Sequence, residues 1–597
     1  MGCGIFAAIE AVGDFKRSGT RAVSAAELDG KTERQQAAAR RYAPFLARLD
    51  HRGPDASGLV SGRVGDFDVH LGMTRLKVVD QSDLAVPFHF RRLGVTLAFN
   101  GEIYNWRELR QELTVVSVQA PQQDDVLGAA LDVSPARGWE TECDAEVVAA
   151  AWRRWGPDCL HRFNGMWAFV LVDHVNDTVF IARDRAGIKP LYYAKRGGSH
   201  LGARIYVASE PKAFPFDLEP RGECPDVAAL EFDFRRHTPF EGVEALEPGS
   251  YLLLRSMDDW RMCLQTRWWT LPDPSPEGYK LGDGVLDHLT ELVVDAIRIR
   301  HAAEVPVGLM LSGGLDSAII QAVCQSDRLY TVTFPDDGVD NVPAARLAAG
   351  GRDVVPVTFT RDDLIAVLPE VAYHLDTPGT WTAVNHWFLN KRIARDNVIV
   401  LAGDGADELF LGYSRYRILN WLDALYADGH LEVYGELLRK TLGPRDAVLI
   451  RMLNRGDNWW ENHCKQLIDA YGGKAGTLAE RMARTDFYTT MQVNLRMADR
   501  MASAFSLENR TPFLDYRIME LAARLPVQYK LSPAAESKLI LRQVAERLGV
   551  PEDIVHERSK KGFSVPRSWS PGDTWDRSWF AELMESTWRK RFFGGQS

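Results

Sequence analysis

The strongest chemical signal in the sequence is a Gly-rich turn that follows a buried apolar run and opens a helical pattern. It reads Leu311-Ser312-Gly313-Gly314-Leu315-Asp316-Ser317. Small residues between a strand and a helix let backbone N–H groups converge on a phosphate, and the helix N-terminus adds partial positive charge. Asp316, in the first helical turn, is placed to hold a magnesium ion against phosphate oxygens. A tight turn capped by an aspartate is the competing interpretation, but the strand context favours phosphate binding.

A second Gly-rich turn follows another apolar run and is dense in carboxylates. It reads Ala402-Gly403-Asp404-Gly405-Ala406-Asp407-Glu408. Acids spaced this closely repel one another unless a cation binds them, although a solvated turn is the alternative interpretation. Because such turns meet at the carboxyl edge of a parallel sheet, the two together predict a nucleotide crevice.

The chain after residue 284 alternates between strand and helix patterns, which predicts a parallel sheet with helices on both faces. Strands are expected at residues 305–311, 329–334, 354–359 and 398–401, and helices at 285–298, from 316 onward and at 364–374. Beyond residue 423 the pattern is mostly helical. The two Gly-rich turns follow the first and the last of these strands.

The first half of the chain has short apolar runs separated by turn residues, which indicates a sheet-rich unit with a few helices. Strands are expected at residues 78–79, 95–99, 166–172, 179–182, 205–208 and 251–254, and helices at 37–49 and 145–155. Residues 269–284, rich in Pro, Gly and Asp, are predicted to link the two halves.

Composition narrows the possible partners. The chain has 597 residues, with 71 basic against 81 acidic side chains and a net charge of −10, which argues against a nucleic-acid or basic membrane surface. Its seven cysteines lie far apart, without the spacing of a zinc site. The amino terminus lacks the pattern of a signal peptide, and the apolar runs are too short to span a bilayer. We therefore expect a cytoplasmic enzyme with no nucleic-acid or membrane partner.

A resemblance to a known family covers nearly the whole chain. Its motifs are residues 3–5 (CGI), 51–55 (HRGPD), 99–105 (FNGEIYN), 182–193 (ARDRAGIKPLYY), 311–317 (LSGGLDS), 402–408 (AGDGADE), 506–515 (SLENRTPFLD) and 558–563 (RSKKGF). In this order they resemble the asparagine synthetase family. The insertions near residues 12–36 and 111–140 have no obvious counterpart.

The resemblance implies an α/β protein built from two enzyme domains. Residues 1–268 would form a class II glutamine amidotransferase domain with the αββα fold of Ntn-type glutaminases. A linker at 269–284 would lead to an ATP-pyrophosphatase domain at 285–597, with a doubly wound parallel sheet and a helical C-terminal part. A homodimer is compatible with the family.

For the glutaminase half the resemblance implies a thiol nucleophile, Cys3, whose own free α-amine acts as the base. Asn100 and Gly101 would form the oxyanion hole. Arg52 would bind the glutamine carboxylate, ideally with both arms of its guanidinium. The substrate ammonium would be held by two carboxylates, Glu102 and Asp144.

For the synthetase half it implies that ATP activates a carboxylic acid as an acyl-adenylate, which ammonia then attacks with release of AMP and pyrophosphate. Pyrophosphate would be bound by Ser312, Gly313, Gly314, Asp316 and Ser317. Mg²⁺ would be held by Asp316 and Asp407. The rest of the nucleotide would be contacted by Met310, Gly403 and Asp404. Lys560, with Lys538 as a second candidate, would neutralise charge at the α-phosphate.

Three departures from the family pattern matter for function. Gly2 stands between Met1 and Cys3, which blocks the α-amine unless Gly2 is removed on maturation or was added for expression. The usual SGEG is replaced by Ala402-Gly403-Asp404-Gly405. The acceptor segment, residues 376–386, reads DTPGTWTAVNH instead of an acidic, Ser-rich sequence.

These departures leave several functions open. Aspartate is the default acceptor, and a larger carboxylic acid of specialised metabolism is the first alternative. A cyclase of the β-lactam synthetase or lasso-peptide type is a second, disfavoured because Cys3, Arg52, Asn100 and Asp144 are retained. A degenerate binding protein is a third, disfavoured by the intact Asp316, Asp407 and Lys560.

Overall fold

The computed structural model divides the chain into two compact units. Unit 1 comprises Met1–Glu223, Arg236–Thr270 and Ser503–Glu508, and unit 2 comprises Cys224–Arg235, Leu271–Ala502 and Asn509–Ser597. The structure describes residues 2–11, 33–116, 138–197, 203–221, 238–256, 259, 264–274, 284–417, 419–420, 471–473, 475–532, 536–557, 566, 569 and 577–594. The short segment Ser503–Glu508 therefore groups with the first half of the chain, although it is distant in sequence.

Unit 1 contains two six-stranded sheets in which the paired strands run antiparallel. The first has the order β10-β8-β9-β1-β3-β2, made of β1 (Gly4–Ala11), β2 (Ala56–Val64), β3 (Phe67–Arg75), β8 (Tyr192–Arg196), β9 (Arg204–Ala208) and β10 (Glu244–Ala245). The second has the order β12-β11-β7-β6-β5-β4, made of β4 (Phe88–Phe90), β5 (Val95–Ile103), β6 (Gly165–Asp173), β7 (Thr178–Arg183), β11 (Ser250–Leu254) and β12 (Thr266–Arg267).

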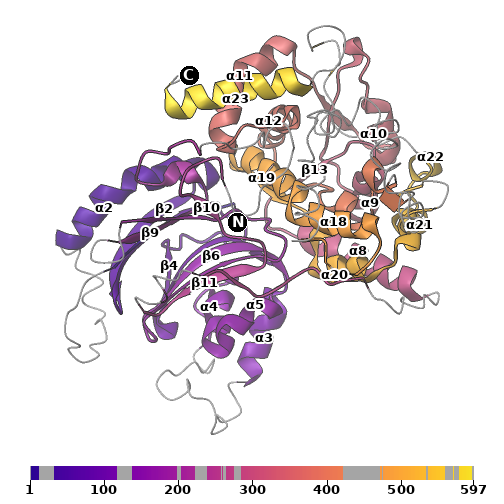
Figure 1. Ribbon diagram of the computed structural model, residues 1–597. Coiled ribbons are helices and arrows are strands. Elements are labelled where there is room, and N and C mark those ends of the chain that lie inside the picture. The colour runs from indigo at the N-terminus through magenta and orange to yellow at the C-terminus, as the bar shows by residue number, and fades with distance from the viewer. Residues whose placement is uncertain are drawn as a thin grey trace, which may run out of the picture. The chain divides into compact units, whose positions relative to one another are not determined.

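Helices cover the outer faces of the two sheets, so that unit 1 has the predicted αββα layering (Figure 1). Helix α2 (Glu33–Leu46) lies on the first sheet and continues into the 3-10 helix η1 (Ala47–Arg52). The second sheet is covered by α4 (Asp144–Trp155), with α3 (Trp106–Val116) and α5 (Cys159–Arg162) beside it. Short 3-10 helices are η2 (Arg91–Leu93), η4 (Gly156–Asp158) and η5 (Pro211–Ala213).

The strands between these layers are buried on both faces, which explains their short apolar runs. Strands β3 and β5 are buried along their whole length, and β6 is buried from its second residue on. Trp167 of β6 stacks on Phe169 and on Trp268, with ring centroids 5.2 and 5.7 Å apart. The strand expected at residues 78–79 is wrong: these residues form a bend after β3, because the run is too short to pair.

Unit 2 is built on a five-stranded sheet of order β15-β14-β13-β16-β17. Its strands are β13 (Val307–Met310), β14 (Leu329–Val332), β15 (Val354–Val357), β16 (Ile399–Leu401) and β17 (Glu508–Arg510). The pairs of β13 with β14 and β16, and of β14 with β15, are parallel, as the sequence pattern predicts.

Helices surround this sheet (Figure 1). They are α8 (Gly284–His301), α9 (Leu315–Cys324), α10 (Val342–Ala349), α11 (Arg361–Leu375), α12 (Trp381–Ile393), α13 (Ala406–Leu409), α18 (Leu478–Tyr488), α19 (Thr490–Ser503), α20 (Tyr516–Arg524), α21 (Leu539–Arg547), α22 (Glu552–Val555) and α23 (Arg577–Phe593), with 3-10 turns η6 (Pro335–Asp337), η8 (Pro512–Leu514) and η9 (Val527–Tyr529). Residues 424–470 of the region predicted to be helical beyond residue 423, residues 275–283 of the predicted linker 269–284 and most of both insertions lie outside the described residues.

A buried ion pair joins the end of β6 to α4. The side chain of Asp173, at 0% exposure, accepts hydrogen bonds from Nη1 and Nη2 of Arg153 at 2.8 and 2.5 Å and from Nε1 of Trp152 at 2.9 Å. Burial by itself would raise the pKa of Asp173, but the hydrogen bonds and charge of Arg153 lower it. The carboxylate therefore contributes stability in its ionised form.

We predict that Asp173→Asn lowers the free energy of unfolding by about 3–5 kcal/mol at pH 7, because it leaves the Arg153 charge without its partner. Since the folded-state pKa is depressed, the wild-type advantage is present above about pH 4 and is lost as the pH falls through the folded pKa. Urea unfolding of both proteins across this range measures the difference. The exposed Asp66→Asn serves as a control, and a loss independent of pH would contradict the assignment.

Candidate functional site

Cys3 lies immediately before β1, at the centre of the first sheet of unit 1. It is fully buried, and its backbone N–H donates to Oδ1 of Asn100 on β5 at 3.0 Å. Burial raises the pKa of the Cys3 thiol; a backbone hydrogen bond from Leu76 and the positive charge of Arg75 oppose this rise, and the negative charge of Glu508 adds slightly to it. A thiol in this state is protonated at neutral pH and needs a base before it attacks a substrate.

The two predicted oxyanion-hole residues are neighbours on β5, opposite β6. Nδ2 of Asn100 is buried and has no hydrogen-bond partner within the described residues, so it is a donor without an acceptor. Gly101 has φ 144°, and a Cβ there would lie 2.0 Å from the carbonyl oxygen of Met166. Only glycine therefore allows β5 and β6 to approach closely enough to keep Asn100 beside Cys3.

Arg52 ends the 3-10 helix η1 and is completely buried. Its Nε donates to the carbonyl oxygen of Cys3 at 3.0 Å. Its Nη1 donates to Oε1 of Glu210 at 2.7 Å and to Oγ of Ser503 at 2.9 Å. The structure thus places the guanidinium of Arg52 against the backbone carbonyl of Cys3, the residue predicted to be the nucleophile.

The predicted ammonium ligands lie at the same end of β5 as Asn100 and Gly101. Asp144, the first residue of α4, is fully buried and accepts from the backbone N–H of Ile103 at 2.9 Å, while Glu102 of β5 is 5% exposed. Burial raises the pKa of Asp144, and the negative charge of Glu508 adds to the rise. A cationic group of a substrate would offset this cost.

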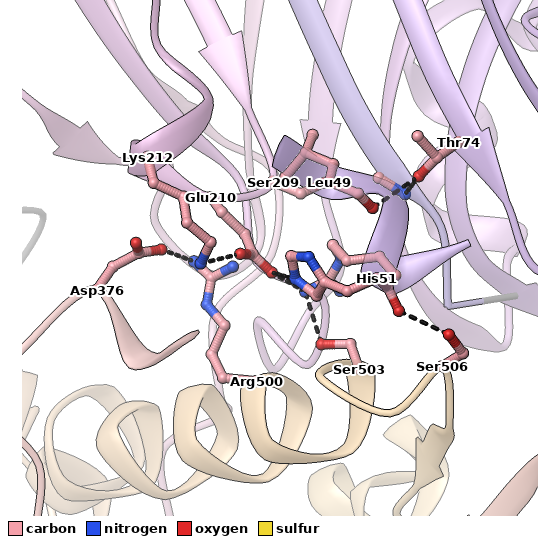
Figure 2. A network of polar contacts seen from close by, with 12 residues as sticks. Leu49, His51, Thr74, Ser209, Glu210, Lys212, Asp376, Arg500, Ser503 and Ser506 are labelled. Carbon is pink, nitrogen blue, oxygen red and sulfur yellow. Dashed lines mark hydrogen bonds and ion pairs between the residues drawn. The ribbon is translucent and has the colours of Figure 1, made fainter. Parts of the chain in front are cut away.

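Sequence reasoning missed several charged residues around Arg52. Glu210, at 0% exposure, accepts from Arg52, contacts Nε2 of His51 at 3.1 Å and pairs with Lys212. Figure 2 shows these side chains together with Ser503 and Ser506, whose hydroxyl donates to the His51 carbonyl at 2.8 Å. The acidic and basic residues in the run SEPK, residues 209–212 after β9, could have indicated a charged cluster. No local pattern in the sequence indicates that Ser503 contacts Arg52.

In unit 2 the first Gly-rich turn joins β13 to α9. Gly313 has φ 75°, and a Cβ there would lie 2.5 Å from backbone carbon of Ala344, so the turn requires glycine. The hydroxyl of Ser317 donates to the Gly314 carbonyl at 3.1 Å, and the backbone N–H of Gly314 donates to the Ser312 hydroxyl at 3.3 Å. Met310 ends β13 directly before this turn.

The second Gly-rich turn follows β16, the neighbour of β13, and brings Asp407 towards Asp316. Nζ of Lys538 lies 2.7 Å from a carboxylate oxygen of Asp316 and 2.8 Å from one of Asp407. Burial would lower the pKa of Lys538, but these two charges raise it, so the ammonium stays protonated. Lys560, the other predicted cation, lies outside the described residues.

The carboxylates of Asp316 and Asp407 both lie against the ammonium of Lys538, and this shows whether a magnesium ion could be held at the same place. Mg²⁺ in nucleotide sites is commonly held by one or two carboxylates together with phosphate oxygens. Asp316 and Asp407 meet this requirement, because both reach the same ammonium of Lys538. When bound, the metal would supply charge neutralisation to the phosphates.

Asp404 and Gly403 complete this turn. Burial raises the pKa of Asp404 to about 6, and the charges of Asp407 and Asp316 add to the rise, against a hydrogen bond from Asn509 at 3.4 Å. A Cβ at Gly403 would lie 3.0 Å from Cβ of Asp316, which shows how closely the two turns approach.

Two domain families match the sequence. The asparagine synthase model matches residues 288–592, and the glutamine amidotransferase domain model matches residues 26–269. The chain belongs to the asparagine synthase family. It is 28% identical to asparagine synthetase [glutamine-hydrolyzing] 1 of Bacillus subtilis, over 90% of this chain and 85% of that one. It is also 25% identical to amidase chry2 of Gibberella zeae, over 88% of this chain and 85% of that one.

Membership confirms the resemblance, the fold class and the enzyme class expected from the motifs. The protein is an asparagine synthetase-type glutamine amidotransferase, a glutamine-hydrolysing ligase for which glutamine and ATP are family substrates. Within the described ranges, no helix is both long enough and apolar enough to cross a membrane.

The segment predicted to bind the acceptor, residues 376–386, runs from the end of α11 into α12. Helix α12 leads into β16, so its first turn lies towards the carboxyl edge of the sheet, and Phe388 accordingly stacks on Phe359 just beyond β15, at 4.2 Å. Asp376 pairs with Arg500 at 3.3 Å. Burial lowers the pKa of His386 to about 4, so its ring is neutral.

We predict that binding of MgATP releases protons near pH 6. A cation beside Asp316 and Asp407 favours the ionised form of Asp404, so its pKa of about 6 falls and about half a proton per site leaves. Calorimetry with the analogue AMPCPP and Mg²⁺, in two buffers of different ionisation enthalpy, measures this release. In Asp404→Asn the release should disappear, whereas proton uptake by the wild type would contradict the prediction.

Proposed function

We propose that the protein uses ammonia from glutamine to convert a carboxylic acid into an amide, through an acyl-adenylate and with release of AMP and pyrophosphate. The observation that carries this proposal is the approach of Asp316 and Asp407 to Lys538 beside the Gly-rich turn. In this arrangement the carboxylates would hold Mg²⁺, the ammonium would face phosphate and the backbone N–H groups of the turn would bind pyrophosphate.

In the glutaminase half, Cys3 would attack the amide carbon of glutamine while Nδ2 of Asn100 and the backbone of Gly101 stabilise the oxyanion. Arg52 would bind the substrate carboxylate, and Glu102 and Asp144 would bind its ammonium. Support comes from the unpartnered Nδ2 of Asn100 and from the hydrogen bond between Arg52 and the Cys3 carbonyl.

In the synthetase half, Ser312, Gly313, Gly314 and Ser317 would bind pyrophosphate, with Met310, Gly403 and Asp404 contacting the rest of the nucleotide. Lys538 pairs with both Asp316 and Asp407. Once a metal neutralises these two carboxylates, the ammonium of Lys538 would turn to the phosphates. Lys560 remains the first predicted cation for the α-phosphate, with Lys538 as the second candidate. A homodimer and a cytoplasmic location also remain predictions.

Aspartate is the default acceptor, but one feature of the chain favours a larger and less polar acid. A site for aspartate must recognise a second carboxylate and an ammonium beside the reacting group. In the acceptor segment the only carboxylate is Asp376, which is paired with Arg500, and the only histidine is neutral. Trp381 adds bulk where α12 begins.

We predict that a larger carboxylic acid supports faster pyrophosphate release than aspartate. The assay contains enzyme, ATP, Mg²⁺ and ammonium, and compares aspartate with glutamate and with aliphatic and aromatic acids. Asp316→Asn should abolish this release and leave glutamine hydrolysis intact, because the two sites lie in different units. Efficient turnover of aspartate, with no larger acid competing, would contradict the acceptor assignment.

We also predict that glutamine use depends on removal of Gly2. The raised pKa of the Cys3 thiol makes a base necessary, and the nitrogen of Cys3 is no base while it forms an amide with Gly2. A general base contributes roughly 10²–10⁴-fold, so protein that retains Gly2 should hydrolyse glutamine that much more slowly.

The comparison uses protein expressed with and without Gly2, each checked by intact mass. Ammonia-dependent synthesis should be equal in both forms and serves as the control for folding. Strong glutamine hydrolysis by protein shown to retain Gly2 would refute this role of the α-amine.

A further inference from the structure

Ser503 lies at the end of α19, 451 residues from Arg52 in the sequence, yet its side chain contacts that guanidinium. Oγ of Ser503 accepts a hydrogen bond from Nη1 of Arg52 at 2.9 Å, in a fully buried contact. Ser503 is 2% exposed and Arg52 is 0% exposed. Water is therefore excluded from this hydrogen bond, and the geometry of the guanidinium depends on protein groups.

The hydrogen bonds of Arg52 determine the plane of its guanidinium. Nε is bonded to the Cys3 carbonyl, and Nη1 is shared between Glu210 and Ser503. Glu210 is in turn held by His51 and Lys212, so it forms a fixed anionic support on one side of Nη1. Ser503 supplies the second, neutral contact to the same nitrogen.

Neighbouring contacts hold Ser503 in place from both directions along the chain. One turn earlier on α19, the buried Arg500 pairs with Asp376 at 3.3 Å. Three residues later, the hydroxyl of Ser506 donates to the His51 carbonyl at 2.8 Å. Figure 2 shows His51, Ser503 and Ser506 within this network. A side chain anchored on both sides is suited to orient another group.

We propose that Ser503 is a positioning residue for glutamine binding, which it aids by fixing the guanidinium of Arg52. This inference rests on the proposed role of Arg52 as the ligand of the glutamine carboxylate. Recognition of a carboxylate by a guanidinium requires a fixed orientation of the guanidinium plane, and misplacement weakens binding more than it changes the chemistry at the amide carbon. The residue comes from the part of the sequence that the synthetase family model matches, residues 288–592.

The test measures glutamine hydrolysis by the full chain without Gly2, in wild type and in Ser503→Ala. Loss of one buried hydrogen bond should raise KM for glutamine about tenfold and change kcat less than about twofold. With 4-aminobutanamide, which is glutamine without its α-carboxylate, kcat/KM should be the same in both proteins. A loss of general stability would instead affect both substrates equally, and that result would overturn the proposal.

Matched variants separate the possible outcomes. Ser250→Ala makes the same substitution at another buried serine of unit 1, where the hydroxyl donates to the Pro248 carbonyl at 3.4 Å, so KM for glutamine should stay within about twofold of wild type. An equal rise in both variants would overturn the specific role of Ser503. Ser503→Thr retains the hydroxyl and should restore KM.

Arg52→Lys distinguishes failure of this inference from failure of the proposed clamp. Lysine keeps the charge but not the planar fork, so KM for glutamine should rise strongly. If Arg52→Lys loses glutamine binding while Ser503→Ala does not, only the role of Ser503 is wrong. If Arg52→Lys binds glutamine normally, the clamp itself is wrong. Ammonia-dependent synthesis by every variant reports that unit 2 is intact.

Discussion

A buried guanidinium must find an acceptor for its N–H groups inside the protein, and Arg52 imposes this requirement on unit 1. Its bonds to the Cys3 carbonyl, Glu210 and Ser503 bring together the start of β1, the turn after β9 and the end of α19. One of these elements begins next to Cys3, the proposed nucleophile. The hydrogen bonds that satisfy one buried side chain therefore also fix the surroundings of that residue.

Charge compensation also organises the acidic cluster in unit 2, but there the buried groups that need a partner are carboxylates and the partner is a cation. There the excess charge is negative, since Asp316, Asp404 and Asp407 follow two adjacent strands, and Lys538 provides the compensating cation. The position of Lys538 before α21 places an ammonium where phosphate and metal are proposed to bind. Binding of metal and phosphate there would replace the ion pairs of Lys538 with Asp316 and Asp407 by ion pairs to the ligand.

Backbone approach matters as much as charge in both units. Gly101 allows β5 to lie against the Met166 carbonyl, and Gly313 allows the phosphate turn to lie against Ala344. A side chain at either position would meet backbone atoms, which cannot move without shifting a whole strand or helix. The glycines of the two sites thus fix distances between elements, whereas the polar residues beside them carry the chemistry.

The sequence by itself determined the family, because its motifs are local, and the resemblance to that family implied the αββα fold and the residues proposed to react. The parallel sheet of the second half followed from the alternation of strand and helix patterns. The SGGLDS and GDGADE turns are examples of these local motifs, since each carries its strand, its glycines and its acids within a few residues. Only the tertiary structure decided that Lys538 pairs with both acids, that Glu210 supports Arg52 and that Ser503 belongs to unit 1. These contacts join residues far apart in the chain, and no local pattern encodes which buried charges meet, because that depends on how whole elements pack.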